Sequence, residues 1–389
     1  MRIAIFTNII DGHHLEYIHH IYEMAVADDT NEYIFILPQK FLEVKDCLVW
    51  ENKGHVDWCF FEKDLGQQTL SFFSQIVSSF RICSLLRHYI RHYKCDVLYV
   101  NSLMHLLPLA PVMLAYNSCK VFGVIYKIYL YDAKGSFISD TINRIKYTLF
   151  SKSFVFSNVL ILNDSDSAGN LNKIYSTEKF QFIPDPYIKL PVGHLIDIRQ
   201  KYHIDSAKVV FSHIGALSVN KSTIEILTSL KYLDNEAKKH YVFIFAGVVH
   251  DEIKEEFYQL LKSLDPSVHV LVEDRFCTYE EIASLCVGSN ALLLPYKRTS
   301  QSSGIIGYAS QFGCPVIATS SGLLGKLVKQ YNLGILIDDI TPECLMNAYR
   351  CIEEGKIERP SMQYCEAHHV EQFQFVIKSC INQIASNIN

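Results

Sequence analysis

The sequence lacks the features that mark several classes of protein. It has no basic excess, since 36 Lys and Arg stand against 41 Asp and Glu, a formal net charge of -5 over 389 residues. Proteins that hold nucleic acid neutralise its phosphates with surplus cations, so nucleic-acid binding is not expected here. No run of about 18 uninterrupted apolar residues occurs, so no membrane-spanning helix is expected. The first ten residues are interrupted by Thr7 and Asn8, which argues against a secretory leader.

Paired cysteines are also missing. The chain has 12 cysteines, but none forms a CxxC pair and their spacing shows no regular framework. Structural zinc and a disulfide scaffold are therefore disfavoured, and reduced, mostly buried thiols of a cytosolic protein are expected. Apolar residues, in contrast, are plentiful: 49% hydrophobic against 20% charged residues excludes disorder. The length suits two domains, each with its own core.

Short apolar runs alternate along the whole chain with segments whose apolar residues have helical spacing. The predicted strands are 2–7, 33–37, 97–100, 120–126 and 159–162, and then 208–214, 241–245, 269–272, 291–294 and 315–318. Strands separated by helices indicate βαβ units and parallel sheets. Pro184 and Pro186 bracket Asp185 and force an extended path between the two series. We therefore predict an α/β fold with a Rossmann-like domain over 1–185, a connection over 186–200 and a second Rossmann-like domain over 201–365.

Ligands of such domains bind beyond the carboxyl ends of the parallel strands, so two domains facing each other form a cleft. The strongest loop signal follows the predicted strand 291–294. A loop rich in small hydroxyl residues, Ser300-Gln301-Ser302-Ser303, leads to Gly304, where a helix is predicted to start. Free N–H groups at a helix start, with serine hydroxyls beside them, suit an anion. An isolated Ser-Ser-Gly is usually an ordinary helix cap, but its place after a buried strand favours the anion site.

Two other loops follow the first strand of each series. Gly215 turns the chain after 208–214, and Lys221 six residues later is placed to aim its ammonium at a diphosphate, with an exposed helix start as the alternative. Gly12 turns the chain after 2–7 and puts His13 or His14 at a helix start, where an imidazole can donate to a phosphate or take a proton.

Four histidines in that segment raise the question of a metal site. His13, His14, His19 and His20 include no i,i+4 pair, so no metal is expected, and a solvated helix surface is the alternative.

The order and spacing of these loops resemble the GT-B glycosyltransferases, and within them the GT4-like retaining group that uses nucleotide-sugar donors. The resemblance extends over the whole chain and is strongest from about Val209 to Asp338. The matching stretches are Gly215 to Lys221, Ala246-Gly247, Arg275-Phe276, Leu294-Pro295, Ser300 to Gly304, Gly313 to Thr319 and Gly334 to Ile337.

The resemblance implies a role for each matching residue. Donor-binding residues would be Gly12, His13, Gly215, Lys221, Arg275, Phe276, Ser300, Gln301, Ser302, Ser303, Gly304 and Tyr308. Lys221 and the serine loop would hold the diphosphate, and the main chain at Arg275 and Phe276 would meet the nucleobase. Such enzymes need no metal or other cofactor, because the helix dipole and cationic side chains stabilise the departing nucleoside diphosphate. Residues 366–389 would form a helix that packs back on the first domain.

The chain departs from the family pattern at three positions. The family's paired glutamates, which contact the transferred sugar and the ribose, fall on Ser300 and Tyr308. The histidine that often follows a middle strand of the first domain falls on Tyr126. His14 is left as the catalytic candidate, and in a retaining reaction the departing phosphate can itself assist the acceptor.

Basic and aromatic residues gather in two segments of the first half. Residues 71–94 carry Arg81, Arg87, Arg91 and Lys94 and no acid, and residues 118–154 have six cations against two acids. Such segments suit anionic lipid, where a lipid-linked acceptor lies, whereas helices that cover the sheet with snorkelling basic side chains are the alternative.

The predicted activity is transfer of a sugar from a nucleoside-diphosphate sugar to a saccharide or lipid-linked saccharide. We expect a cytoplasmic enzyme, with peripheral contact to the inner face of the membrane, that acts in surface polysaccharide biosynthesis. Two alternatives stay open: a sugar-nucleotide epimerase of the same fold, and a non-catalytic partner subunit, which the missing glutamates allow.

Overall fold

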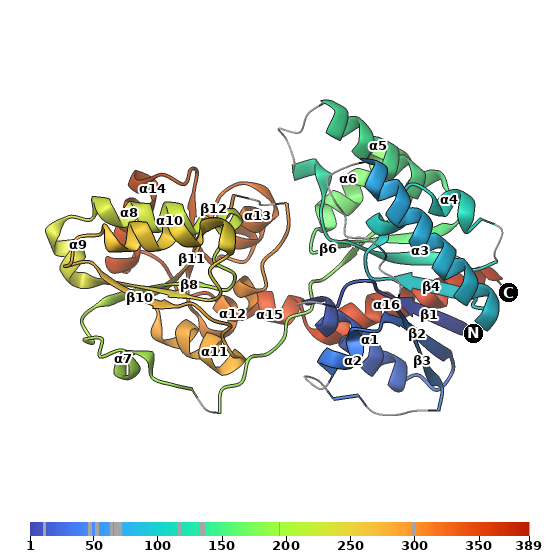
Figure 1. Ribbon diagram of the computed structural model, residues 1–389, viewed down its shortest axis with the longest axis horizontal. Helices are drawn as coiled ribbons and strands as arrows, with labels where there is room; N and C mark the ends of the chain where they lie inside the picture. Colours follow the sequence, from blue (N-terminus) through green and yellow to red (C-terminus); the bar gives the residue numbers. More distant parts are fainter. Residues whose placement is uncertain are drawn as a thin grey trace. The chain divides into compact units, whose positions relative to one another are not determined.

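The computed structural model describes residues 1–10, 13–45, 49–50, 54–62, 65, 72–115, 118–131, 137–193, 195–297 and 300–388. It divides into two compact units, Met1–Pro186 with Val370–Asn389, and Tyr187–His369. Each unit is a parallel sheet with helices packed on it (Figure 1). The predicted α/β class with two Rossmann-like domains is therefore confirmed.

The first unit has a seven-stranded sheet in the order β3-β2-β1-β4-β5-β6-β7, with every neighbouring pair parallel. The strands are β1 (Arg2–Phe6), β2 (Glu32–Pro38), β3 (Val56–Phe61), β4 (Val97–Val100), β5 (Lys120–Ile125), β6 (Phe156–Leu162) and β7 (Phe180–Ile183). The strand order reverses between β1 and β4, so the loops after these two strands lie at the topological switch point.

The helices of the first unit pack on this sheet (Figure 1). They are α1 (His13–Val26), α2 (Phe41–Val44), α3 (Phe72–Tyr93), α4 (Ala110–Met113), α5 (Phe137–Lys152), α6 (Ser165–Tyr175) and α16 (Val370–Ile388), with short 3-10 turns η2 (Leu103–Leu106) and η3 (Tyr129–Tyr131). Ile18 of α1 and Phe373 of α16 belong to one buried apolar cluster with the central strands. The C-terminal helix thus lies in the first unit although it is last in the chain.

The second unit has a six-stranded parallel sheet in the order β10-β9-β8-β11-β12-β13. Its strands are β8 (Val209–Ile214), β9 (Tyr241–Ala246), β10 (His269–Glu273), β11 (Ala291–Leu294), β12 (Val316–Thr319) and β13 (Gly334–Ile337). Here the order reverses between β8 and β11, and the loops that follow these strands are the ones predicted to bind phosphate.

Eleven helical segments surround this sheet. They are α7 (Ile198–Lys201), η4 (Val219–Lys221), α8 (Thr223–Ser229), η5 (Leu230–Tyr232), α9 (Asn235–His240), α10 (Asp251–Lys262), α11 (Tyr279–Gly288), α12 (Ile305–Phe312), α13 (Gly322–Gln330), α14 (Pro342–Glu353) and α15 (Gln363–Ala367), counted over the described residues. All cysteines in the described part of the chain are free thiols and most are buried, as predicted.

The segment expected as a connection, 186–200, packs on the second unit. Gln311 of α12 accepts the Leu190 N–H and donates to the Leu190 carbonyl, both at 2.9 Å. The Tyr187 N–H donates to the His368 carbonyl at 2.7 Å, so the chain enters and leaves the second unit side by side. These hydrogen bonds explain why the unit begins at Tyr187 rather than after the whole segment.

Candidate functional site

The loops after β8 and β11 meet at the carboxyl edge of the second sheet. The Lys297 N–H donates to the Asn220 carbonyl at 2.9 Å, which ties one loop to the other. Below them, the ring nitrogens of buried His213 contact the Leu293 carbonyl at 2.8 Å and the Thr223 hydroxyl at 3.1 Å. Burial lowers the pKa of His213 to about 3, so the ring is neutral at physiological pH. Its two hydrogen bonds link β8 to β11 and to the start of α8.

Two glycines set the path of the loop after β8. Gly215 has a φ of 98° and Gly247 a φ of 147°, both in the range that side chains rarely adopt. A Cβ at position 247 would lie 1.8 Å from the Gly215 carbonyl oxygen, and one at 215 would lie 2.7 Å from the Lys221 Nζ. Glycine at both positions therefore allows the Lys221 side chain to fold back over the end of β8.

Lys221 and Ser303 come together around Tyr296. The Lys221 Nζ lies 5.3 Å from the centroid of the Tyr296 ring and 3.5 Å from the Ile214 carbonyl oxygen. The Tyr296 hydroxyl lies 3.5 Å from the Ser303 Oγ. Among the described residues Lys221 has no carboxylate partner, and an unneutralised cation at this edge of a parallel sheet suits an anionic ligand.

Tyr296 was not selected from the sequence. The available signal was its position, since it is the first aromatic residue after β11 and follows Pro295 directly. Its ring places the Lys221 ammonium and its hydroxyl approaches the serine loop, so it acts as the centre of the arrangement.

The serine loop leads into α12 as predicted. Gly304 is the N-cap residue of α12 and has no side chain to cap the helix. Of the two residues that stand where the resemblance expects glutamates, Ser300 is 5% and Tyr308 is 6% exposed, while Gln301 is exposed. Ser302 and Ser303, nearest the helix start, are partly exposed.

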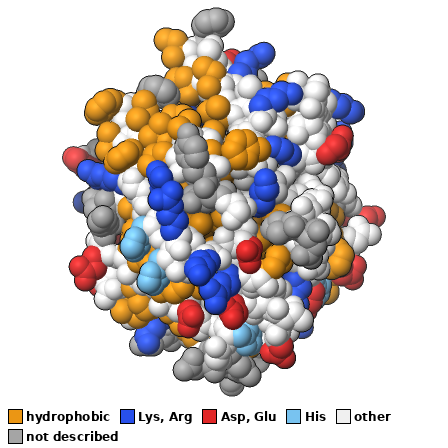
Figure 2. Space-filling model, turned by 90° about the vertical axis from the view of Figure 1, so that its right-hand side faces the viewer, with side chains coloured by type: hydrophobic (Ala, Val, Ile, Leu, Met, Phe, Trp, Pro, Cys, Tyr) orange, Lys and Arg blue, Asp and Glu red, His pale blue; other side chains and the backbone are white. Residues whose placement is uncertain are grey.

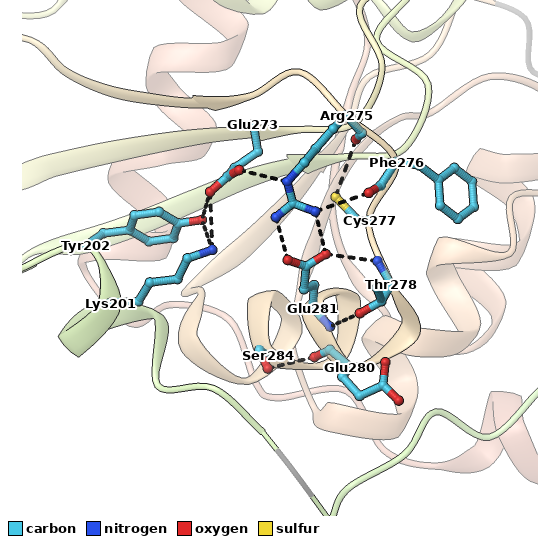
Figure 3. A network of polar contacts seen from close by, with 10 residues as sticks. All are labelled: Lys201, Tyr202, Glu273, Arg275, Phe276, Cys277, Thr278, Glu280, Glu281 and Ser284. Carbon is cyan, nitrogen blue, oxygen red and sulfur yellow. Dashed lines mark hydrogen bonds and ion pairs between the residues drawn. The ribbon is translucent and has the colours of Figure 1, made fainter.

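Arg275 belongs to a network of charged side chains at the carboxyl end of β10 (Figure 3). Its guanidinium donates to both carboxylate oxygens of Glu281, at 2.9 and 2.5 Å, and to Glu273 at 3.2 Å. The Arg275 hydrogen bond lowers the pKa of Glu281 to about 2. The Arg275 side chain is engaged within the protein, and the loop instead exposes the Phe276 ring, which is 84% accessible.

A small pocket adjoins this network. It is lined by Ile196, Ile198, Lys201, Tyr202, Ala246, Glu273, Arg275, Cys277, Glu281, Ser284 and Leu285. The Tyr202 hydroxyl donates to Glu273 at 2.6 Å and the Lys201 Nζ donates to it at 3.2 Å. Because the charged groups of this pocket neutralise one another, it suits a diphosphate less well than the surroundings of Lys221.

The carboxyl edge of the first sheet carries a neutral hydrogen-bonded cluster. The Asn101 Oδ1 accepts from the Tyr126 hydroxyl at 2.8 Å and from the Tyr99 hydroxyl at 3.2 Å, and the Asn101 Nδ2 lies 3.1 Å from the His14 Nδ1. Two hydroxyl donors need an acceptor, so the amide oxygen faces the tyrosines and the amide nitrogen donates to His14. The proton of the neutral His14 ring therefore lies on Nε2.

A second histidine lies at the same edge and was missed from the sequence. The His105 Nδ1 lies 2.9 Å from the Asn8 Oδ1, and burial lowers the pKa of His105 to about 4. Gly12 and the side chain of His13 lie outside the described residues. Tyr126, where the resemblance expects a histidine, packs edge to face on His14 with 4.9 Å between ring centroids.

Solved structures similar to this chain cover its whole length. Sucrose-phosphate synthase from Thermosynechococcus elongatus has a TM-score of 0.73 and 13% identity over 100% of both chains. HepE from Anabaena, in complex with UDP and glucose, has a TM-score of 0.66 and 16% identity over 100% of this chain and 99% of that one. UDP-GlcNAc 2-epimerase from Neisseria meningitidis, bound to UDP-GlcNAc, has a TM-score of 0.59 and 14% identity over 98% of this chain and 100% of that one.

Similarity in sequence alone is much weaker. No protein-family model matches the sequence, and no curated protein matches it. The likeness is therefore one of architecture, and it agrees with the two parallel sheets of seven and six strands. The chain has the GT-B fold.

Proposed function

We propose that the protein is a glycosyltransferase that moves a sugar from a nucleoside-diphosphate sugar to a saccharide or lipid-linked saccharide acceptor. The observation that carries this proposal is the Lys221 ammonium at the switch point of the second sheet, without a carboxylate partner among the described residues. It lies over the Tyr296 ring, whose hydroxyl contacts Ser303. Chains of similar fold hold UDP with glucose and UDP-GlcNAc, which supports a nucleotide sugar as the ligand.

In this proposal the donor diphosphate lies against Lys221, Ser302, Ser303 and the first amides of α12. As the bond from the sugar to the diphosphate breaks, negative charge grows on the departing phosphate oxygen. The ammonium and the positive end of the helix stabilise that charge without a metal ion. The nucleobase lies against the backbone at Arg275 and Phe276, since the Arg275 side chain already pairs with Glu281.

We further propose that the reaction retains the configuration of the sugar. The departing phosphate oxygen takes the proton of the acceptor hydroxyl, so a strong protein base is unnecessary. His14 donates a hydrogen bond through Nε2, because Asn101 occupies its Nδ1. His14 is therefore proposed as a hydrogen-bond donor and not as a base.

Calorimetry with UDP, GDP and their sugars tests the donor site. Lys221→Met is expected to weaken binding about a hundredfold, because it removes charge-assisted hydrogen bonds to a phosphate. Lys231→Met is the matched control, since Lys231 is an exposed lysine of η5 in the same unit. Equal affinity of the two variants for every nucleotide would overturn the proposal.

The similarity to UDP-GlcNAc 2-epimerase favours a second candidate function. An epimerase needs acid and base groups around the sugar and no acceptor, so the two activities separate in a single incubation. A nucleotide sugar kept with the enzyme and no acceptor is expected to keep its sugar configuration, whereas conversion to an epimer would establish the alternative. A non-catalytic partner subunit, which Ser300 and Tyr308 in place of glutamates allow, would bind donor and transfer nothing even when acceptor is added.

We also propose that the first unit docks on anionic membrane, where a lipid-linked acceptor lies. Phe73 and Phe80 of α3 are 74% and 55% exposed, and Ile138 and Ile145 of α5 are 70% and 55% exposed. Figure 2 shows apolar side chains gathered on one face of the molecule, with Lys and Arg side chains beside them. No helix in the described ranges is long and apolar enough to cross a bilayer. Exposed apolar residues next to cations are typical of peripheral attachment.

A further inference from the structure

Three side chains of α1 converge near the middle of the helix, away from its first turn. His19, His20 and Glu23 each offer one ligand atom, and these three atoms all lie within 4.8 Å of one another. The Glu23 oxygen is 3.3 Å from the His20 nitrogen and 3.8 Å from the His19 nitrogen. Around a tetrahedral ion with ligand bonds of about 2.0–2.1 Å, ligand atoms are about 3.3 Å apart. The separation of Glu23 and His20 already equals this spacing, and no other separation in the cluster exceeds 4.8 Å.

The hydrogen bond of His19 directs an electron pair into this cluster. The His19 Nε2 lies 2.8 Å from the Val49 carbonyl oxygen, which only accepts, so Nε2 carries the proton. The neutral ring then presents a lone pair at Nδ1, towards the Glu23 carboxylate. Metal-bound histidines have this same arrangement, in which the far ring nitrogen donates to a carbonyl or carboxylate. A lone pair facing an anion is unfavourable, and a cation between them removes the repulsion.

Burial separates the two histidines from water but leaves an opening. The His19 and His20 side chains are 13% and 11% exposed, whereas that of Glu23 is 52% exposed. The His20 Nε2 is buried and has no hydrogen-bond partner among the described residues. The Gln374 side chain of α16 donates to the His20 carbonyl at 2.8 Å and holds this turn of the helix in place. An ion would thus reach the cluster along Glu23 and find rings that are already positioned.

We propose that His19, His20 and Glu23 bind a divalent transition-metal ion of the Zn²⁺ class, with water in the remaining position. Two imidazoles and one carboxylate favour such ions over Mg²⁺ and Ca²⁺, which prefer oxygen ligands. The four histidines of this segment show no metal-binding spacing among themselves. Glu23 stands four residues after His19 and three after His20, which supplies the missing helical spacing. This site is independent of the proposed transferase activity.

The chain contains a reporter beside the proposed site. The Trp50 ring lies edge to face on His19, with 4.9 Å between centroids, and Trp58, the other tryptophan, is 5.6 Å from Trp50. Ni²⁺ or Co²⁺ bound at His19 is therefore expected to quench tryptophan fluorescence. In the wild-type protein we expect saturable quenching by Ni²⁺ at one equivalent, and recovery of the fluorescence when Zn²⁺ displaces the Ni²⁺.

Variants distinguish this site from nonspecific metal binding at other positions. Glu23→Gln changes a half-exposed side chain and leaves the fold intact, and it is expected to weaken quenching by Ni²⁺ about tenfold to a hundredfold. His19→Gln with His20→Gln is expected to abolish it. The control is His88→Gln with His92→Gln, because these exposed residues form an i,i+4 pair on α3 that can chelate an ion by itself. Absence of quenching in the wild type, quenching unchanged by Glu23→Gln, or quenching lost only in the α3 control would each overturn the proposal.

Discussion

The carboxyl edges of the two sheets have the same architecture and opposite chemistry. In the second unit the edge carries the Lys221 ammonium over the Tyr296 ring, whose hydroxyl contacts Ser303. In the first unit it carries Asn101, Tyr126 and His14, joined by hydrogen bonds through the Asn101 amide. A positive edge suits a diphosphate, whereas neutral donors and aromatic faces suit a sugar. The fold supplies two equivalent positions, and a few side chains decide what each one binds.

The contacts that hold the two edges in place differ in part. In the second unit, backbone meets backbone where Gly247 passes the Gly215 carbonyl. In the first unit, side chains far apart in sequence hold the edge, such as Asn101 and His14. The first unit has a comparable backbone approach, since a Cβ at Gly123 would lie 1.9 Å from the Val100 carbonyl oxygen. Its edge differs in the side-chain hydrogen bonds of Asn101, so polar truncations should damage the first edge most.

The largest effect is expected from Gly247→Ala. The new Cβ would lie 1.8 Å from a carbonyl oxygen at a φ of 147°. Backbone strain and overpacking together predict a loss of about 4 kcal/mol in the free energy of unfolding. Urea denaturation followed by circular dichroism measures this loss. Gly169→Ala in α6 is the control, because its Cβ has nothing within 4 Å and should stabilise the helix by less than about 1 kcal/mol. Similar results for both variants would contradict the proposed role of close packing.

This contrast also explains how much was predictable from sequence. The central strand β11 is a continuous apolar run followed by Pro295, and β8 is apolar except for Ser212 and His213 and is followed by Gly215, so the sheet and its phosphate-side loops could be predicted. The edge strands β3, β7 and β13 were missed. Polar residues interrupt the first two, Asp57 in β3 and Gln181 in β7, and β13 is only four residues long.

Contacts between residues far apart in the sequence could not be predicted. Asn101 and His14 are 87 residues apart, and no local pattern indicates that they meet. The family resemblance implied that the main chain at Arg275 meets the nucleobase and said nothing of its side chain, whose pairing with Glu281 depends on how β10 and α11 approach each other. Local patterns therefore predict elements and loops, but tertiary packing decides which side chains remain available to a ligand.

Acid is expected to destabilise both units through one buried histidine each. Burial lowers the pKa of His213 to about 3 and that of His105 to about 4. Below about pH 6.5 the histidine is protonated in the unfolded chain but stays neutral in the folded chain. Its contribution to the free energy of unfolding is therefore fully present above that pH and is lost as the pH falls towards the pKa of the folded state. A loss of about 3 kcal/mol between pH 7 and pH 4 is expected from each histidine.

Urea denaturation at the two pH values, on His213→Gln and His105→Gln separately, measures the histidine contributions. Each variant should lose less stability on acidification than the wild type, whatever its stability at pH 7. Unchanged pH dependence in both variants would show that other groups control acid unfolding.

Asn101→Ala is expected to reduce turnover about tenfold in the proposed reaction, because His14 loses the donor that keeps its proton on Nε2. The affinity for donor should stay unchanged, since the diphosphate residues belong to the other unit. Nitrogen-15 NMR of the His14 ring is the direct measurement, with Nδ1 expected to report an acceptor in the wild type and mixed tautomers in the variant. Asn8→Ala, at the same edge but paired with His105, is the control. A His14 spectrum that does not change in Asn101→Ala would refute the positioning role.

The smallest effect is expected on membrane attachment. The experiment tests whether the first unit alone attaches the protein to the membrane. Phe73→Ser should weaken binding to vesicles of anionic lipid about fivefold, because an exposed phenyl ring no longer enters the interface. Phe276→Ser is the matched control, since Phe276 in the second unit is still more exposed, at 84% against 74%. Added salt should weaken vesicle binding of the wild type as charges are screened, and neutral vesicles should bind poorly. If Phe276→Ser weakens vesicle binding as much as Phe73→Ser, exposed rings attach the chain wherever they occur, and the contrast between the units does not extend to the membrane.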